Sequence, residues 1–265
     1  MVGVLLLRGM LVGVLAGILC FGFLKIAGEP SVDRAVAFET QLEEAKAHAE
    51  AHSHGAAAPQ GTAAQREEPY PELVSRGVQA GLGLFTGVAV YSAAFGGLFA
   101  LVFAFFYGRI GDFGPRATAA LLAAMGIVAV YIVPTLKYPA NPPSVGDGET
   151  IGMRTALYFG IVAVSLAAMI AAGTLRSRLS SRYGAWNAFL IAAAAYFIVI
   201  LAVGLALPTV DEVPAQFPAV VLWQFRIASL GAQTIMWATL GLVFGALTER
   251  SVIGRSRPQV KAAVV

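Results

Sequence analysis

The segment ATAALLAAMGIVAVYIVPTL, residues 117–136, decides the fold, because it carries no charged side chain over a length that can cross a membrane. A bilayer core of about 30 Å needs roughly 20 mostly apolar residues in a helix. Five further stretches meet this requirement: Val4–Ala27, Val78–Tyr107, Thr155–Leu175, Trp186–Leu207 and Phe225–Leu247. The sequence therefore predicts an all-α, polytopic membrane bundle with six transmembrane helices.

The composition supports this fold class. Hydrophobic residues make up 58% of the 265 residues and charged residues 12%. Soluble domains typically contain about 45–50% apolar and about 25% charged residues. The chain has too few charged side chains to cover a water-exposed protein of this size. Its single cysteine excludes a disulfide framework and a cysteine-rich zinc site.

The N-terminal stretch, Val4–Ala27, resembles a signal peptide in having Arg8 ahead of an apolar run. Its apolar run is longer than the ~7–15 residues of such peptides, and no A-x-A cleavage site precedes Glu29. We therefore expect a retained helix.

Glycines four residues apart predict close contacts between helices, since small residues let backbones approach. Such pairs occur in the first, second and last stretches: Gly9, Gly13 and Gly17; Gly83 and Gly87; Gly241 and Gly245. The second stretch is long enough to tilt or break, and Gly96-Gly97 is its expected weak point.

Basic residues predict the orientation, because they cluster in the short cytoplasmic loops of membrane proteins. With the N-terminus inside, the inner segments hold ten bases against two acids, whereas the outer segment 29–76 holds four bases against nine acids. Both termini are therefore expected in the cytoplasm. The sequence pI of about 9.1 then reflects topology, and nucleic-acid binding is not expected.

This topology divides the chain into three parts: a first transmembrane helix (1–27), an outer loop (28–76), and a five-helix remainder with a cytoplasmic tail (77–265). The first half of the outer loop, Ser31–His54, is rich in helix-forming residues. We expect an amphipathic helix there that Ser31 caps and Gly55 ends.

All three histidines of the chain lie in this outer loop. Glu44, His48 and His52 are spaced one helical turn apart and would share a face, and His54 follows. Imidazole and carboxylate groups are suitable ligands for Co²⁺, Ni²⁺ or Zn²⁺. The same pattern also fits a solvated helix face with incidental histidines.

The three outer corners have related sequences: Pro30-Ser31-Val32-Asp33, Pro143-Ser144-Val145-Gly146-Asp147 and Pro208-Thr209-Val210-Asp211. An arginine precedes or begins each following stretch, at Arg76, Arg154 and Arg226. The pattern suggests one helical hairpin used three times. Asp33, Asp147 and Asp211 would then ring an outer vestibule that gathers cations. Alternatively, each aspartate caps a helix or pairs with an outer arginine.

Within the spans, six polar residues are candidates for an internal path or for hydrogen bonds between helices: Gln79, Tyr91, Ser92, Asn187, Gln233 and Thr234. No Asp or Glu falls in the middle of a span, and no nucleotide-binding or hydrolase motif is present. An enzyme is therefore not expected, which leaves transport or a structural role in a membrane complex.

Three segments resemble the CbtA family of cobalt transporter subunits. They are Glu29–Glu39 (EPSVDRAVAFE), Leu136–Asp147 (LKYPANPPSVGD, continuing to Arg154-Thr155) and Phe217–Arg226, with FPA at its start and LWQFR at its end. The resemblance extends over nearly the whole chain. It implies a bacterial inner-membrane protein that imports cobalt for cobalamin synthesis, usually with a small single-span partner, CbtB. Members commonly carry a histidine-rich first outer loop, which here has three histidines.

We therefore expect a multi-pass inner-membrane component of a Co²⁺ transporter, with Co²⁺ or Ni²⁺ as a transient ligand and no resident cofactor. The outer helix would deliver the ion to a mouth shaped by Lys137, Tyr138 and Asn141, in which Asn141 offers an oxygen ligand. The alternative is a non-transporting membrane scaffold that assembles with the small partner through its glycine ridges. A homo-oligomer is compatible with either hypothesis.

Overall fold

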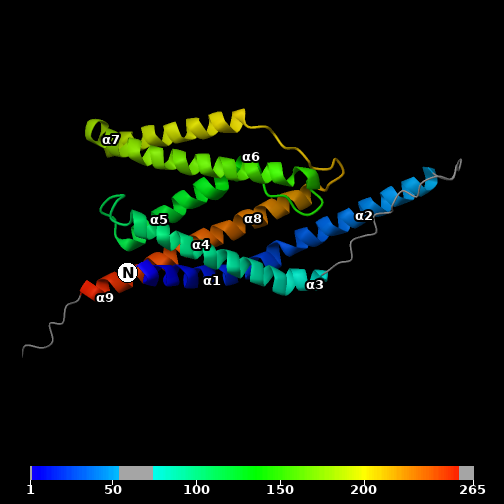
Figure 1. Ribbon diagram of the computed structural model, residues 1–265, viewed down its shortest axis with the longest axis horizontal. Helices are drawn as coiled ribbons and strands as arrows, with labels where there is room; N and C mark the ends of the chain where they lie inside the picture. The colour runs from blue at the N-terminus through cyan, green and yellow to red at the C-terminus, as the bar shows by residue number, and fades with distance from the viewer. Residues whose placement is uncertain (1, 54–73, 257–265) are drawn as a thin grey trace, which may run out of the picture.

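The structure is a computed structural model that describes residues 2–53 and 74–256. Every regular element in these residues is helical: α1 (Val2–Ala27), α2 (Glu29–Ser53), α3 (Arg76–Val78), α4 (Leu84–Phe106), α5 (Pro115–Gly126), α6 (Val133–Lys137), α7 (Ile151–Ala206), α8 (Ala219–Thr239) and α9 (Gly245–Ser256). Figure 1 shows them as an elongated bundle from which α2 projects. Three π-helical turns continue the helices at Gln79–Gly83, Ile127–Ile132 and Leu240–Phe244, and a 3-10 turn spans Gly148–Thr150.

Five continuous helical segments are long and apolar enough to cross a membrane, judged by length and composition. They are Val2–Ala27, Arg76–Phe106, Pro115–Lys137, Gly148–Ala206 and Ala219–Ser251. The all-α class is thus confirmed. Four of the five segments match one predicted span each, and the fifth contains two.

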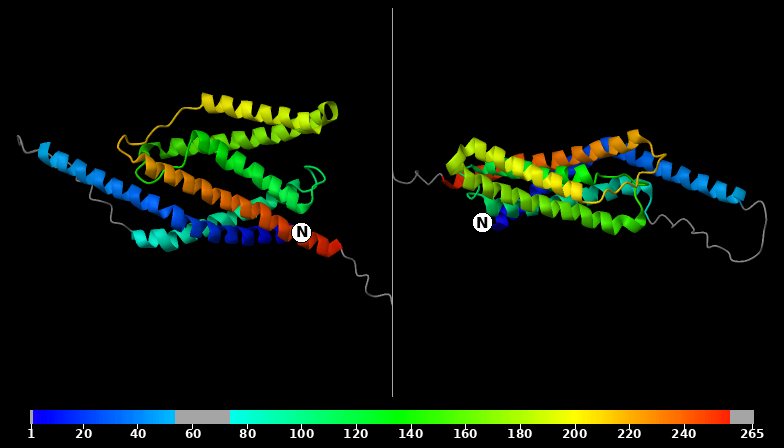
Figure 2. Two further views of the ribbon diagram at one scale, coloured as in Figure 1. Left: turned by 180° about the vertical axis from the view of Figure 1, so that it is seen from behind. Right: turned by 90° about the horizontal axis from the view of Figure 1, so that it is seen from above.

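That fifth segment includes α7, which holds both predicted spans 155–175 and 186–207. The helix reverses at Gly184, where φ is +77° and ψ is 162°, a conformation that glycine adopts at low cost. Its two arms lie side by side in both views (Figures 1 and 2). The hydroxyls of Ser165 and Tyr196 join the arms at 2.8 Å.

The glycine ridge of α1 packs against α4, which confirms the predicted close approach. A Cβ added at Gly13 would lie 2.8 Å from the Ala93 Cα, and one at Gly17 would lie 2.9 Å from the Ala89 Cα. Neither backbone could give way without moving a whole helix. Gly241 of the last predicted span packs against α5 in the same manner.

The expected break at Gly96-Gly97 was wrong, because α4 runs without interruption from Leu84 to Phe106. Gly96 provides close packing: its added Cβ would lie 2.9 Å from the Gly13 Cα. The irregular turn of this span lies earlier, at Gln79–Gly83.

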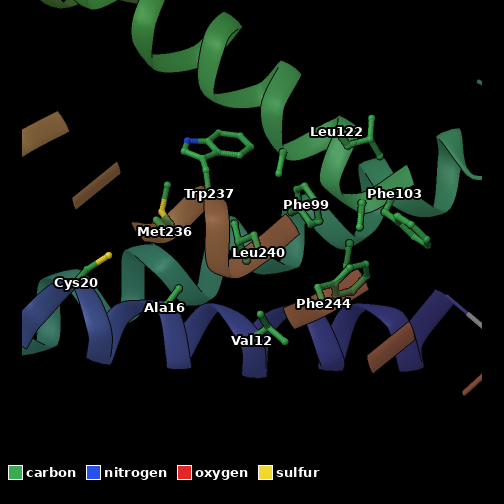
Figure 3. Packing of buried hydrophobic residues seen from close by; sticks show 13 residues of the cluster. Val12, Ala16, Cys20, Phe99, Phe103, Leu122, Met236, Trp237, Leu240 and Phe244 are labelled. Atoms are coloured by element: carbon green, nitrogen blue, oxygen red, sulfur yellow. The ribbon is translucent and has the colours of Figure 1, made fainter. Parts of the chain in front are cut away.

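The main hydrophobic core lies where α1, α4, α5 and α8 meet. Figure 3 shows large aromatic side chains from α4 and α8, with the small residues of α1 below them. Phe99 and Phe103 of α4 meet Phe244 edge to face, with ring centroids 5.5 and 5.1 Å apart. This core fixes the position of α8, which carries part of the site described below.

The helix α2 continues almost directly from α1, and its first turns pack on the outer loops. Phe38 meets Phe217 edge to face at 5.2 Å, and the Ser144 hydroxyl donates to the Ala35 carbonyl at 2.8 Å. Ser144 itself has a φ of +67°. The predicted Ser31 cap was wrong: α2 begins at Glu29, and the buried Ser31 hydroxyl donates to the Gly28 carbonyl.

The two ends of the bundle carry different loops. The starts of α1 and the last helix α9 lie at the same end as the Gly184 turn (Figure 1). There Arg116 pairs with Glu249 at 2.5 Å, and Arg8 donates to the Ser251 hydroxyl at 2.9 Å. The predicted outer corners 143–147 and 208–211 lie in loops at the opposite end, which we call the loop end. The predicted turn at Pro30–Asp33 was wrong, because these residues belong to helix α2.

Candidate functional site

An open cavity of about 1000 Å³ lies at the loop end, between the segments 136–159 and 209–213 and the start of α8. Polar and charged side chains make up much of its lining: Lys137, Tyr138, Asn141, Arg154, Tyr158, Asp211, Glu212 and Arg226. The cavity therefore joins two of the three predicted corners, and a helix of the core forms one wall.

Glu212 connects the two corners. Its carboxylate accepts a hydrogen bond from the Asp147 backbone N–H at 2.8 Å and lies 3.4 Å from the Arg154 Nε. Hydrogen bonds from the Thr150 side chain and the Asp147 backbone, together with the charge of Arg154, lower the pKa of Glu212. Because these partners favour the charged form, Glu212 holds the corners together as a carboxylate.

The guanidinium of Arg154 occupies the space that Gly146 leaves by having no side chain. Gly146 has a φ of +121°, and a Cβ added there would lie 2.8 Å from the guanidinium carbon of Arg154. Arg154 Nη2 also donates to the Asp147 carbonyl at 3.0 Å. The glycine thus allows the guanidinium to lie flat on the corner.

Arg226 makes a similar contact from α8. Its Nε donates to the Ala140 carbonyl at 3.2 Å, and its Nη2 donates to the Asn141 side-chain oxygen at 3.0 Å. The side-chain oxygen of Asn141, the predicted metal ligand, therefore lies in the cavity but already accepts a hydrogen bond from the Arg226 guanidinium. A metal ion would have to compete with the guanidinium for it.

Tyr138 links the loop after α6 to the loop after α7. Its ring is buried, and its hydroxyl donates to the Pro208 carbonyl at 2.9 Å. Burial raises the pKa of Tyr138, so the phenol stays neutral and keeps donating. The predicted mouth residues Lys137, Tyr138 and Asn141 thus all line one cavity.

The three predicted aspartates have separate environments. Asp33 pairs with Arg76 at 2.9 Å, and Glu29 pairs with the same guanidinium at 2.5 Å. Asp147 caps the 3-10 turn, where its side chain accepts the Glu149 N–H at 3.0 Å. Asp211 alone of the three lines the cavity. Asp33 therefore pairs with an outer arginine and Asp147 caps a helical turn, as the alternative hypothesis for these aspartates proposes.

The predicted metal face on α2 is partly described. Glu44 and His48 are exposed and one helical turn apart on α2. His52 lies within α2, but its side chain is outside the described part, and His54 lies outside the described residues altogether. Across residues 2–53 and 74–256, no group of three or more His, Cys, Asp or Glu side chains could hold a metal ion.

Sequence reasoning missed Glu212 as a cavity residue. It assigned the ion pairs of the outer arginines to the aspartate of each corner, whereas Arg154 lies beside Glu212 of another corner. The adjacent acids Asp211-Glu212 were a signal, because they place a second carboxylate in the corner that holds Asp211. One of them faces Arg154, and Asp211 is left exposed beside it.

Comparison with protein families gives a match over nearly the whole chain. The family model described as "Probable cobalt transporter subunit (CbtA)" matches residues 2–249. No curated protein and no solved structure matches the chain. The family description names a transporter subunit, which is not an enzyme class, and implies a further component. With five span-capable helical segments, the chain is a multi-pass membrane protein.

Proposed function

The chain belongs to the CbtA family, and from that premise we propose that it is the membrane-embedded subunit of a Co²⁺ importer in the inner (plasma) membrane that supports cobalamin synthesis. The observation that carries this proposal is the open cavity at the loop end, whose lining includes four charged side chains besides Asp211; it would serve as the entry point on one side of the bilayer. Asp211 is its exposed carboxylate, and hard oxygen donors suit a hydrated divalent cation.

The proposed orientation has six crossings, with the two arms of α7 crossing separately. The basic residues near Arg109, Arg116 and the Gly184 turn, at the end that holds the start of α1, would face the cytoplasm. The loop end and its cavity would then face outward. This orientation also puts α2, with its predicted metal ligands, outside the membrane.

In this proposal α2 acts as a capture arm. Glu44, His48 and His52, with His54 just beyond, would bind Co²⁺ transiently and raise its concentration near the cavity. Asp211 would receive the ion, while Asp33 and Asp147 would hold the outer corners in place through the contacts described above. Three ligands on one helix give exchangeable binding, which suits delivery.

The energy for import would come from the membrane potential. An inside-negative potential favours entry of each positive charge by about 2.3 kcal/mol per 100 mV, hence about 4.6 kcal/mol for a divalent ion. No nucleotide-binding motif is needed for this step. A small single-span partner of the CbtB type would contribute further ligands.

The test is the cobalt content of cells that lack other cobalt importers. Cells with the chain should accumulate more cobalt than cells without it, and Asp211→Asn should remove most of the difference. The matched control is Asp112→Asn, an exposed aspartate in the loop after α4. Equal cobalt content with and without the chain would contradict the proposal. Nickel is measured in parallel, because ligand chemistry separates the two metals weakly.

The alternative is a non-transporting scaffold that assembles with the small partner, and the word "subunit" in the family description favours it. The predicted contact surface for this partner is already occupied: the ridge of Gly9, Gly13 and Gly17 packs against α4 of the same chain. A partner would have to use another face. Stable co-purification with the partner, together with unchanged cobalt content, would favour the scaffold.

A further inference from the structure

One face of α8 is polar along much of its length. Arg226, Ser229, Gln233 and Trp237 follow one another at intervals of three, four and four residues, so they lie on the same side of the helix. Arg226 lines the cavity at the loop end. The other three continue from it toward the middle of the bundle, and we call these four residues the α8 polar face.

Hydroxyl groups from neighbouring helices meet this face. The buried Tyr131 donates its hydroxyl to Ser229 at 2.9 Å, and the Gln233 side chain lies near the hydroxyl of the half-exposed Tyr91. Oxygen and amide groups from three separate helical segments therefore converge below the cavity, in a region that is otherwise apolar.

Tyr158 joins the cavity to these groups. It lines the cavity, lies near Tyr91 and Tyr131, and donates its hydroxyl to the Val130 carbonyl at 3.4 Å. Pro134, four residues after Val130, has no N–H and so cannot donate the α-helical hydrogen bond to this carbonyl. The Tyr158 hydroxyl thus bonds the backbone of the π-helical turn Ile127–Ile132 beside the polar face.

Trp237 is the independent observation that points to a ligand. Its side chain is 6% exposed, and its indole N–H is buried with no hydrogen-bond partner among the described residues. In Figure 3 this nitrogen lies on the side of the ring turned away from Phe99 and Leu122. An unpaired buried N–H is costly in a membrane, so a water molecule is the natural acceptor at this position.

We propose that the α8 polar face, with Tyr91, Tyr131 and Tyr158, is a hydrated route by which a divalent cation passes from the cavity into the membrane. This inference rests on the proposed transport function. Phenol, hydroxyl and amide groups bind the water shell of an ion and hold the ion itself weakly, as a conducting site requires. The charge of Arg226 at the entrance opposes entry of a cation, and the carboxylates of Asp211 and Glu212 in the same cavity offset this repulsion.

The single cysteine of the chain makes the route testable by chemical labelling. Cys20→Ser removes the native thiol and keeps a donor for the Ala232 carbonyl. Ser229→Cys and Gln233→Cys then place one thiol on the route. The control is Thr234→Cys, because Thr234 is exposed on another side of α8 and its hydroxyl bonds the Leu230 carbonyl of its own helix.

Right-side-out membrane vesicles are treated with a charged, membrane-impermeant thiol reagent, and unreacted thiols are counted after denaturation. We expect both route variants to react, Co²⁺ to slow their reaction, and the Thr234→Cys thiol to stay unreacted. Thiols on the route that react no faster than Thr234→Cys would overturn the inference. A labelling rate that Co²⁺ does not change would also overturn the inference, because the α8 polar face would then be hydrated but would not carry the ion.

A second measurement separates this inference from the proposed function. Tyr131→Phe removes the hydroxyl that meets Ser229, and cobalt influx should fall several-fold; Tyr183→Phe, at the exposed Gly184 turn, is the control. Normal influx in Tyr131→Phe with unreactive route thiols would overturn the route alone. No cobalt influx in the wild-type chain would overturn the proposed function and the route with it.

Discussion

Arg226 of α8 donates from Nη2 to the side-chain oxygen of Asn141 at 3.0 Å, while its Nε donates to the Ala140 carbonyl at 3.2 Å. A core helix thereby holds the loop that forms one wall of the cavity. The two bonds need donors that diverge at a fixed angle, which a guanidinium provides and an ammonium does not.

Arg226→Lys should therefore destabilise the protein by about 1–3 kcal/mol, since hydrogen bonds to a charged group contribute about that much. The measurement is thermal unfolding of the detergent-solubilised protein. Arg34→Lys is the matched control, because Arg34 is exposed and bonds the Pro30 carbonyl of its own helix. Equal stability of Arg226→Lys and wild type would show that Arg226 does not anchor the loop.

The α1–α4 contact predicts a strong size limit at Gly13. Gly13→Leu would force apart two backbones that lie within van der Waals contact, at a cost of about 3 kcal/mol or more. Size-exclusion chromatography in detergent should show loss of the folded species. Gly22→Leu, on the same helix with nothing within 4 Å of an added Cβ, should remain folded. If both variants behave alike, the close approach is absent.

Glu212 predicts a pH-dependent contribution to the stability of the outer loops. Its pKa is lowered in the folded protein from an ordinary value of 4.5. The stabilisation is therefore fully present above pH 4.5 and is lost as the pH falls through the lowered folded value.

Glu212→Gln should consequently be less stable than wild type at pH 7, and the difference should vanish on acidification, when the native carboxyl also becomes neutral. Unfolding temperatures of both proteins across this pH range provide the measurement. Glu149→Gln, an exposed neighbour, is the control. A difference that stays constant with pH would rule out the carboxylate as its source.

The capture arm predicts measurable metal binding on α2. His48→Ala and Glu44→Gln should each weaken Co²⁺ binding to the full-length protein several-fold, because they remove a ligand from the same helical face. Isothermal titration with cobalt chloride measures the change. Glu43→Gln, one position off that face, should leave the affinity unchanged. Unchanged affinity in the first two variants would leave the histidines as incidental surface residues.

The membrane spans could be predicted from the sequence because lipid requires long apolar helices. The prolines and acids at 143–147 and 208–211 correctly predicted loops, whereas the same pattern at Pro30–Asp33 lies within α2. The reversal at Gly184 lies between the predicted spans 155–175 and 186–207, but the sequence did not indicate that the helix continues through residues 176–183 before it. Polar residues are compatible with a helix that extends past the bilayer, so charge marks the membrane surface and not the helix end.

The partners of single side chains could not be predicted in the same way. Ser92 and Thr234 were candidates for an internal path, yet Ser92 is buried beside Gly13, and Thr234 bonds its own helix. Hydropathy does not determine which face of a helix meets which neighbour. Gln233 lies near Tyr91 because α4 and α8 share the core packing, in which Trp237 meets Phe95 and Phe99 edge to face.

Cobalt influx into right-side-out vesicles under an imposed potential tests the central claim most directly. Vesicles that carry the chain should take up radioactive cobalt faster as the interior becomes more negative, and Asp211→Asn should reduce that influx. Influx equal to that of vesicles lacking the chain, at every potential, would contradict the account.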